Sequence, residues 1–586
     1  MNGVSLASAL HESLSRLIGA GPAGAALPLQ QVVAALTAAL ERGELGLDLQ
    51  GPAPAELAGA TADADPEAGA DASPHDAALA WPSAHLAALE ACGWLVEAAD
   101  LAARPQAPVV RDGRWLRWRR WHQQLQHCLD ALIALGAEPL EPAPTAAQRR
   151  VAQGLAAKAG LDPQQCAAVE ALLQRRLVLL SGGPGTGKTS TVVQMLAAAL
   201  RVEPGLRLQL TAPTGKAAAR LAAAVSQGAQ PLEAPLAQRL QQLNGLTLHR
   251  LLEARGDGAG FRRDRRRPLE LDLLVVDEVS MVDLPLMAAL LAALPPACRL
   301  LLLGDPGQLA PVGPGAVLLE LSRPERLTAL GPAAVELRTT YRNNGAIADL
   351  AAQLRQLEAS GPALLEQLRP RLALLEPSAN LHWLEAPAQR APAEALRQLR
   401  EHQQRVRSLA IALPSPADTS AAATAARQAL LAELERLILL SPVRQGRWGV
   451  EGLHAALLGE ATGRGPQHWP LGTPVLNSRN LPEQGLANGD IGVLVAVGGE
   501  RLVLFPGERL LHPTRLLQAE PALALTVHKA QGSQYQEVLL LLPPGRPCDA
   551  RLLYTGLTRA RQRAWLITAA AASDPPSTDA SQAHTA

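Results

Sequence analysis

Aromatic side chains are scarce in this sequence, which has nine tryptophans, three tyrosines and two phenylalanines among 586 residues. The composition leans instead on Ala, Leu, Pro and Gly, as GC-rich coding sequences do. Its five cysteines lie far apart without a CxxC pair, which excludes a disulfide framework and a cysteine-based zinc site and is typical of a reduced, cytoplasmic protein. The N-terminal segment lacks the apolar run of a signal peptide or membrane span, so no membrane association is expected.

A net charge of either sign is also missing, because 54 Lys and Arg balance 54 Asp and Glu. Global charge therefore does not point to a nucleic-acid partner. It does not exclude one either, since a narrow groove can hold phosphates while the outer surface stays neutral. The length predicts several domains, because single hydrophobic cores stop growing at roughly 250–300 residues.

The N-terminal quarter differs in composition from the rest of the chain. Residues 1–150 are expected to form a mainly helical domain, and the Ala-, Asp-, Pro- and Gly-rich stretch 51–78 is expected to be flexible. Trp115, Trp118 and Trp121 alternate with arginines in RDGRWLRWRRWHQQL, a pattern that can stack on bases. Packing of the indoles in a helix or hairpin, inside a small domain or against a protein partner, is the favoured interpretation.

Short apolar runs alternate with amphipathic segments from Pro163 onwards. Such alternation indicates parallel sheets covered by helices on both faces. The expected strands of a first set are 176–180, 206–210, 271–278 and 299–305, with a helix at 189–201. The expected strands of a second set are 436–440, 523–528, 537–542 and 564–569. The fold class is therefore α/β with two tandem domains, expected at 151–340 and 341–570 and followed by a disordered tail at 571–586.

The segment SGGPGTGKT (Ser181–Thr189) follows a predicted strand and opens a predicted helix, which is the context of a phosphate-binding loop. Its glycines let backbone N–H groups turn inward around phosphates, and the helix N-terminus adds its dipole. Lys188 is expected to reach the β- and γ-phosphates of ATP, and the Thr189 hydroxyl to ligate Mg²⁺. The predicted nucleotide-binding residues of this loop are Gly182, Gly183, Pro184, Gly185, Thr186, Gly187, Lys188, Thr189 and Ser190.

Polar residues follow the next two predicted strands. Asp277 is expected to hold Mg²⁺ through water and Glu278 to polarise the attacking water, because adjacent residues of an extended chain point to opposite sides. Asp305 and Gln308, in GDPGQL, lie where a γ-phosphate sensor would sit. The sequence therefore predicts ATP hydrolysis.

These motifs, in this order, resemble those of superfamily 1 helicases of the class that moves 5′ to 3′, and among them the alpha subunits of exodeoxyribonuclease V. The similarity runs from about residue 160 to residue 568. It implies two RecA-like P-loop domains, with a small β-barrel inserted in the second near 470–518. It also implies roles at the ATP site for Gln165 (adenine contact), Tyr341 (adenine stack), Arg342 (arginine finger) and Arg559 (second γ-phosphate contact).

The resemblance further implies a DNA track. TAPTGKAAARL, TLHRLL and LTVHKAQGSQY are similar to the family's DNA-contacting motifs and supply the predicted DNA contacts Pro213, Thr214, His249, Thr526, His528 and Lys529. A helix-cap or buried structural role remains the alternative for His249, Thr526, His528 and Lys529. Few aromatic residues are left to grip bases in this region, and Trp448 is a candidate for stacking.

Two features depart from a simple motor pattern. His454 stands where the family usually has Asn, so no contact is assigned to it. The basic run RRDRRR (Arg262–Arg267) could bind DNA, but a solvated loop is the favoured interpretation. No nuclease constellation of acidic residues with Lys remains once the ATP site is assigned.

The resemblance implies an ATP-dependent 5′–3′ DNA helicase that acts on the 5′-ended single strand at duplex ends, in double-strand break repair and recombination. Its partners would be beta and gamma subunits in a heterotrimer, with the nuclease in the beta subunit and residues 1–150 docked on the gamma subunit. One alternative is a stand-alone relative, although residues 1–150 contain no evident helix-hairpin-helix pattern. Another is a non-motor scaffold whose ATP site only switches assembly, against which the complete catalytic set argues.

Overall fold

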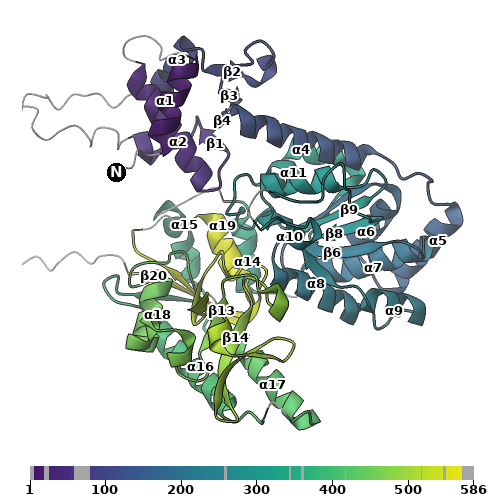
Figure 1. Cartoon of the computed structure of the whole chain (residues 1–586), viewed down its shortest axis with the longest axis vertical. Helices are drawn as coiled ribbons and strands as arrows, with labels where there is room; N and C mark the ends of the chain where they lie inside the picture. The colour runs from purple at the N-terminus through teal and green to yellow at the C-terminus, as the bar shows by residue number, and fades with distance from the viewer. Residues whose placement is uncertain are drawn as a thin grey trace, which may run out of the picture. The chain divides into compact units, whose positions relative to one another are not determined.

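The computed structural model describes residues 6–18, 25–57, 80–256, 260–341, 345–357, 362–415, 418–516, 518–545 and 549–570. The chain divides into two compact units (Figure 1). The first comprises Met1–Gly182, Gly187–Pro213 and Ala218–Arg338; the second comprises Gly183–Thr186, Thr214–Ala217 and Thr339–Ala586. The predicted arginine finger Arg342, the predicted tail 571–586 and most of the stretch 51–78 lie outside the described residues.

The N-terminal region combines helices with a small sheet. The helices are α1 (Leu6–Ile18), α2 (Ala26–Glu41) and α3 (Ser83–Ala91), and the strands are β1 (Gly46–Asp48), β2 (Leu95–Glu97), β3 (Val109–Asp112) and β4 (Trp115–Trp118), in the order β1-β4-β3-β2. A two-residue turn with Gly113 at φ 58° joins β3 to β4, as hairpins favour. Trp118 is buried in the core of this region and Trp121 packs against it. Trp115 is half-buried, with the guanidinium groups of Arg114 and Arg117 over its ring. The structure thus supports the packing interpretation for Trp118 and Trp121.

The first unit is built on a six-stranded sheet with all its pairs parallel, in the order β10-β5-β9-β8-β6-β7. The strands are β5 (Leu177–Gly182), β6 (Leu208–Ala212), β7 (Gly245–Thr247), β8 (Leu273–Val276), β9 (Arg299–Gly304) and β10 (Ala334–Leu337). Successive side chains of a strand point to opposite faces, so Leu177 and Leu179 enter one apolar cluster and Val178 and Leu180 the other. The predicted double-sided parallel sheet is confirmed.

Helices cover both faces of this sheet (Figure 1). One apolar cluster contains α6 (Pro163–Gln174), α7 (Lys188–Val202), α8 (Gly215–Gly228) and α9 (Ala234–Gln241), and α5 (Ala146–Lys158) packs on α7. The other contains α4 (Arg119–Ala137), α10 (Leu248–Leu251), α11 (Leu284–Ala293), α12 (Val317–Leu321) and α13 (Pro324–Leu330). Helix α4 lies within the segment 1–150, yet its Leu125, Leu129 and Leu132 are part of this core.

The second unit holds a five-stranded sheet, also with parallel pairs, in the order β11-β20-β19-β12-β18. The strands are β11 (Leu381–Ala386), β12 (Leu437–Ser441), β18 (Ala524–Thr526), β19 (Tyr535–Leu542) and β20 (Ala560–Ala569). The accompanying helices are α14 (Ala346–Leu354), α15 (Pro362–Leu372), α16 (Ala393–Ile411), α17 (Ala421–Leu434), α18 (Val450–Leu458) and α19 (Ala550–Leu557). The four strands predicted for this domain are found, and β11 is an addition to them.

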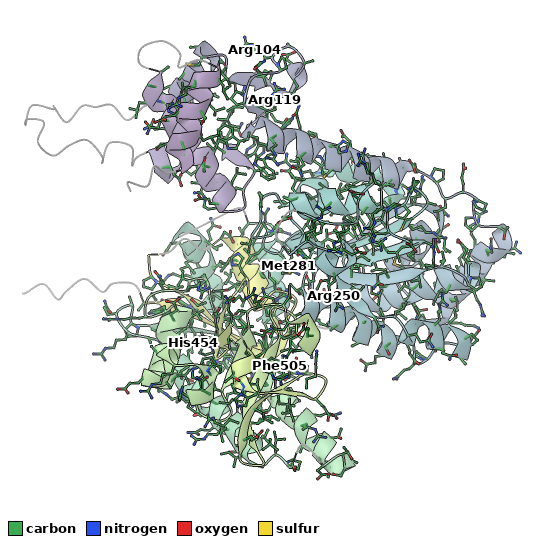
Figure 2. All side chains as sticks on the ribbon, viewed as in Figure 1. Arg104, Arg119, Arg250, Met281, His454 and Phe505 are labelled. Atoms are coloured by element: carbon green, nitrogen blue, oxygen red, sulfur yellow. The ribbon has the colours of Figure 1, made fainter. Side chains whose placement is uncertain are left out.

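A second sheet lies between β12 and β18 in the chain, where the inserted barrel is predicted. Its strands are β13 (Pro474–Asn477), β14 (Ile491–Val497), β15 (Glu500–Phe505), β16 (Arg509–Leu511) and β17 (Ala519–Pro521), paired antiparallel in the order β16-β15-β14-β13-β17. Phe505, labelled in Figure 2, is fully buried in its core. Among the described residues, no helix combines the length and apolar character that crossing a bilayer requires.

Candidate nucleotide site and DNA-contact motifs

The glycine-rich loop connects the end of β5 to the start of α7. Gly185 and Gly187 have φ values of 77° and 80°, in the left-handed region that glycine adopts without a steric cost. The Thr186 hydroxyl donates to the Gly183 carbonyl at 2.9 Å, and the Lys188 ammonium donates to the Gly182 carbonyl. The side chain of Lys188 therefore folds back over the loop it follows.

Helix α7 begins at Lys188 with no side-chain cap on its first N–H groups. The first turn of a helix carries unsatisfied backbone donors and the positive end of the macrodipole. An anion such as a phosphate satisfies both, and the preceding glycines leave room for it. The position and local conformation of the loop therefore suit the phosphates of a nucleotide.

Asp277 and Glu278 follow β8 but do not continue as an extended chain. The N–H of Asp277 donates to the Thr211 carbonyl at 2.8 Å, whereas Glu278 turns into the left-handed region with φ 52° and ψ 44°. The expectation that the two carboxylates diverge along a strand is wrong, because the strand ends at Val276. A left-handed non-glycine residue is strained, and such strain is concentrated at functional sites.

The carboxyl group of Asp277 has a pKa raised to about 6. Removal of the group from water is the larger cause, the charge of Glu278 adds to it, and the nearby charges of Lys188 and Arg220 oppose it. A cation beside Asp277 would counter both of the raising causes. The donor chemistry therefore fits a hard divalent cation with oxygen ligands such as Mg²⁺.

Gln308 follows β9 on a turn organised by Asp305. A carboxylate oxygen of the fully buried Asp305 accepts from the Gly307 N–H at 3.0 Å, and the amide Nε2 of Gln308 lies 3.4 Å from the other oxygen. The carbonyl Oε1 of Gln308 is buried and finds no hydrogen-bond donor among the described residues. A buried acceptor without a partner costs about 1–3 kcal/mol, so this atom suits a donor brought by a ligand.

The predicted adenine contact Gln165 is buried in a capping box at the start of α6. Its side-chain oxygen accepts from the Asp162 N–H at 3.1 Å, while its own N–H donates to the Asp162 carboxylate at 2.9 Å. The amide NH₂ of Gln165 is therefore the group left to recognise a base. The predicted adenine stack Tyr341 is 57% exposed, and its N–H donates to the Gly185 carbonyl at 2.9 Å, which ties it to the phosphate loop.

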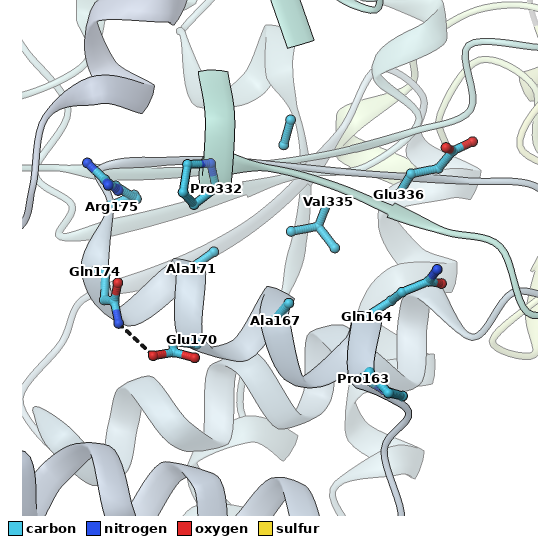
Figure 3. Close-up of a pocket in the computed structure, with 11 residues that line it drawn as sticks. Pro163, Gln164, Ala167, Glu170, Ala171, Gln174, Arg175, Pro332, Val335 and Glu336 are labelled. Carbon is cyan, nitrogen blue, oxygen red and sulfur yellow. Dashed lines mark hydrogen bonds between the residues drawn. The ribbon is translucent and has the colours of Figure 1, made fainter. Parts of the chain in front are cut away.

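Gln164, which the sequence motif did not single out, also has a defined role. Its side-chain oxygen accepts from the Arg338 N–H at 2.9 Å, linking α6 to the chain that leaves β10. It lines a cavity of about 420 Å³ between α6 and β10, with Glu336 nearby and Gln174 and Arg175 at the other end (Figure 3). The sequence does not show this cavity, because it forms only when β10 pairs with β5 in the folded sheet.

Three threonines of the DNA-contact motifs cap the turns that follow them. The hydroxyl oxygens of Thr214, Thr247 and Thr526 accept from the N–H groups of Ala217, Arg250 and Lys529 at 3.3, 3.2 and 3.2 Å. The structural alternative for Thr526 is thus realised. A capping hydroxyl still carries a hydrogen that can be donated to a phosphate, so capping and DNA contact are compatible.

The predicted DNA contacts His249, His528 and Lys529 differ in their surroundings. His249 is exposed, with its ring 5.9 Å from that of Phe261. His528 is half-buried, and burial lowers its pKa against the opposing charge of Asp549. The ammonium of Lys529 lies 2.9 Å from a carboxylate oxygen of Glu520.

Arg559, His454 and Trp448 are all buried in the second unit. The Arg559 guanidinium donates to the carbonyls of Thr555 and Ser533 at 3.1 and 3.3 Å. The Nε2 atom of His454 (labelled in Figure 2) lies 3.1 Å from the carbonyl oxygen and 3.2 Å from the nitrogen of Ala524. Burial lowers the pKa of His454 to about 4, so the ring is neutral near pH 7, where it contacts the backbone of Ala524. The Trp448 indole is packed in the core and offers no face to a base.

Comparison with known proteins agrees with this geometry. A family model described as an AAA domain matches residues 165–314, and one described as a UvrD-like helicase C-terminal domain matches residues 521–567. Together with the phosphate loop on a parallel sheet, they define a superfamily 1 helicase. The RecBCD enzyme subunit RecD of Mycolicibacterium smegmatis is 38% identical over 429 residues, which cover 70% of this chain and 72% of that protein. The chain belongs to the RecD family and is an ATP-dependent DNA helicase.

Two further relatives are a second RecD subunit and a RecD2 helicase. The RecBCD enzyme subunit RecD of Haemophilus influenzae is 31% identical over 435 residues, covering 68% of this chain and 67% of that protein. The ATP-dependent RecD2 DNA helicase of Deinococcus radiodurans is 32% identical over 433 residues, covering 71% of this chain but 51% of that protein.

Proposed function

We propose that the protein is the 5′–3′ helicase subunit of a RecBCD-type enzyme, working beside RecB-like and RecC-like chains in double-strand break repair. The observation that carries the proposal is the set of Lys188, Asp277 and Gln308 on one parallel sheet, in a chain 38% identical to a RecD subunit. The strand along which it moves is the 5′-ended single strand at a duplex end. The cytoplasm is the compartment in which such a DNA-repair enzyme works.

At the ATP site, Lys188 binds the β- and γ-phosphates and Glu278 accepts the proton of the attacking water. The carbonyl oxygen of Gln308, which has no donor among the described residues, accepts a hydrogen bond from that water and holds it in line with the γ-phosphate. Arg342 and Arg559 contact the γ-phosphate, so hydrolysis is coupled to movement of the domain that carries them. Arginine fingers of this kind raise phosphoryl-transfer rates by about 10³–10⁵.

The nucleotide is recognised at both ends. The Gln165 amide and the exposed Tyr341 ring bind the adenine. Thr189 and Asp277 would hold Mg²⁺, directly and through water. When bound, Mg²⁺ supplies neutralisation of the phosphate charge.

DNA is held mainly through its phosphates. Pro213, Thr214 and His249 supply contacts from one set of motifs, and Thr526, His528 and Lys529 from another. The scarcity of exposed aromatic side chains supports backbone contacts over base stacking.

The N-terminal region is the proposed docking module for the RecC-like partner, and the sheet from β13 to β17 the proposed small barrel. A stand-alone RecD2-like helicase is the second candidate, favoured by the 32% identity to that protein. The subunit is preferred because this chain is 38% identical to the M. smegmatis RecD over 429 residues, but 32% identical to the RecD2 helicase over 433 residues.

The motor is tested by ATPase assays with and without single-stranded DNA. Wild type is expected to be strongly stimulated, and Lys188→Gln to lose both basal and stimulated activity. Lys158→Gln, a matched change of an exposed lysine at the end of α5, is the control and is expected to behave as wild type. A switch that only directs assembly would show no stimulation, which would contradict the proposal.

Polarity and partnership need separate measurements. A duplex with a 5′ single-stranded tail is expected to be unwound, and one with a 3′ tail is not. Co-purification with RecB-like and RecC-like chains is expected to raise unwinding well above that of the isolated chain. Equal unwinding by the isolated chain would favour the stand-alone helicase.

A further inference from the structure

A basic pocket lies on the segment that joins α10 to β8. Its volume is about 550 Å³, and it is lined by Arg255, Gly256, Arg262, Asp264, Arg266 and Arg267. Among the described residues, the lining contains four guanidinium groups, one carboxylate and no apolar or aromatic side chain. The pocket lies entirely within the first unit.

Hydrogen bonds hold the described backbone on both sides of the pocket. Ala254 and Phe261 form an antiparallel bridge, and the Arg255 N–H donates to the Gly260 carbonyl at 2.9 Å. One Asp264 oxygen accepts from the N–H groups of Arg266 and Arg267 at 2.8 and 3.0 Å. The Asp264 carboxylate is therefore committed to the turn, which fixes the positions of both arginines.

The arginines of this segment fall into two groups. Arg263 is paired, with its Nε 2.7 Å from a Glu253 oxygen. Across the described part of the chain, Arg255, Arg262, Arg266 and Arg267 form no ion pair with a carboxylate. All four are exposed. Four guanidinium groups that line one pocket repel one another. Asp264, and Glu253 beside Arg262 and Arg267, offset part of this repulsion, and an incoming polyanion would relieve the rest.

We infer that this pocket binds successive phosphates of a DNA backbone. The guanidinium fork matches phosphate oxygens in a bidentate manner. The described lining offers no aromatic or apolar side chain to a base or to the apolar face of an acidic peptide. Recognition is therefore electrostatic and independent of sequence.

The position of the pocket along the chain favours DNA over a free anion. The segment starts from α10, which carries the predicted contact His249 and also Arg250 (labelled in Figure 2). The His249 ring lies 5.9 Å from Phe261, so the DNA-contact motif touches the segment that forms the pocket. A strand held at His249 would have its neighbouring phosphates close to the pocket. This inference rests on the proposed DNA track.

The test compares the full chain with the double variant Arg266→Gln/Arg267→Gln. Arg265→Gln is the matched control, because Arg265 belongs to the same run and is exposed but does not line the pocket. Binding of labelled oligo(dT) and of a blunt duplex is measured across a salt series. For each phosphate that the variant no longer binds, the slope of log K against log salt is expected to become shallower by roughly 0.7–0.9, so by about 1.4–1.8 for the double variant.

A gain-of-affinity variant makes the test two-sided. Asp264→Asn keeps an oxygen for the turn but removes the negative charge of the described lining, so tighter binding and a steeper slope are expected. Equal midpoints of thermal unfolding would show that the variants are folded. A double variant that binds both DNAs like wild type would overturn the inference.

Two outcomes separate the inference from its alternatives. If inorganic phosphate or poly-glutamate binding disappears in the double variant while DNA binding is unchanged, the pocket serves a small anion or an acidic protein, and the inference is wrong. If wild type itself fails to bind DNA, the proposed function fails first. If wild type binds DNA and the pocket variants bind it equally well, this inference is wrong while the proposed function stands.

Discussion

The backbone N–H of Glu278 donates a 2.8 Å hydrogen bond to a carboxylate oxygen of Asp277, its own neighbour. This bond fixes the Asp277 side chain at the end of β8 and accompanies the left-handed turn at Glu278. One carboxylate is thus held by the backbone, while the next side chain leaves the line of the strand. The positions of the two side chains are therefore set by a turn, not by the alternation of an extended chain.

Glu278→Gln is expected to separate nucleotide binding from hydrolysis. A general base contributes about 10²–10⁴ to rate, so kcat should fall by that factor while ATP affinity changes only a few-fold. Steady-state ATPase and binding of a fluorescent nucleotide measure the two quantities. Glu325→Gln, an exposed glutamate in the first turn of α13, is the control. Retained turnover in Glu278→Gln would remove Glu278 from the proposed chemistry.

Gln308→Met is expected to lower the ATPase rate without lowering the stability of the fold. The buried Oε1 of Gln308 has no donor among the described residues, and replacing it with an apolar group of similar size removes a desolvation cost of about 1–3 kcal/mol. The variant also loses the 3.4 Å contact from Nε2 to Asp305, which offsets part of this gain, so the ligand-free variant should unfold at about the same temperature as wild type or slightly higher. Its DNA-stimulated ATPase should fall at least about tenfold, because one oriented hydrogen-bonding group is removed. An active variant with lowered stability would contradict both expectations.

His454 should make the stability of the second unit depend on pH. Its folded pKa of about 4 lies below the ordinary value, because burial disfavours the charged ring. The unfolded state therefore binds the proton more readily. The contribution of His454 to the free energy of unfolding is fully present above about pH 6.5 and is lost as pH falls towards the folded pKa. Between about pH 7.5 and pH 5 this amounts to about 2 kcal/mol.

The variant His454→Asn isolates this contribution. Urea unfolding followed at several pH values should show wild type losing more stability than the variant on acidification. The difference between the two proteins is the measured quantity, since other groups titrate in both. Parallel pH profiles would show that His454 is not the group responsible.

Glu520 is expected to restrain DNA binding by holding Lys529. The Lys529 ammonium lies 2.9 and 3.0 Å from the two Glu520 oxygens, and Arg444 lies 3.5 Å from one of them. Glu520→Gln should free both cations and tighten DNA binding by about two- to fivefold, the scale of a partly exposed ion pair. Lys529→Gln should weaken binding. Weaker binding by Glu520→Gln would instead show that the pair supports the site as a unit.

Much of the fold can be predicted because buried parallel strands are continuous apolar runs. The apolar runs place β5, β8 and β9 to within a few residues, and the loop before Lys188 is recognisable from its glycines. The catalytic candidates follow from their position at strand ends. The local sequence pattern is sufficient to locate a strand where both faces of the sheet are buried, because such a strand must be apolar throughout.

Other features depend on contacts that no local pattern reveals. The left-handed Glu278 requires knowing that β8 stops at Val276. The strands β1 to β4 have three or four residues each, too few to show an alternation. The carbonyl of Gln308 is left without a partner by the packing around it, and the pocket around Arg266 depends on how Asp264 folds the turn. Each of these is set by tertiary structure.

Helix α4 has a consequence for how this protein can be divided or recombined. Its Leu125, Leu129 and Leu132 pack in the same core as Leu177 and Leu300 of the ATPase sheet. Arg117, just before it, is buried between Asp112 and Glu320 of α12. A chain shortened to start at residue 151 would uncover one face of its own motor. A swap of N-terminal modules between relatives must therefore join upstream of Arg117.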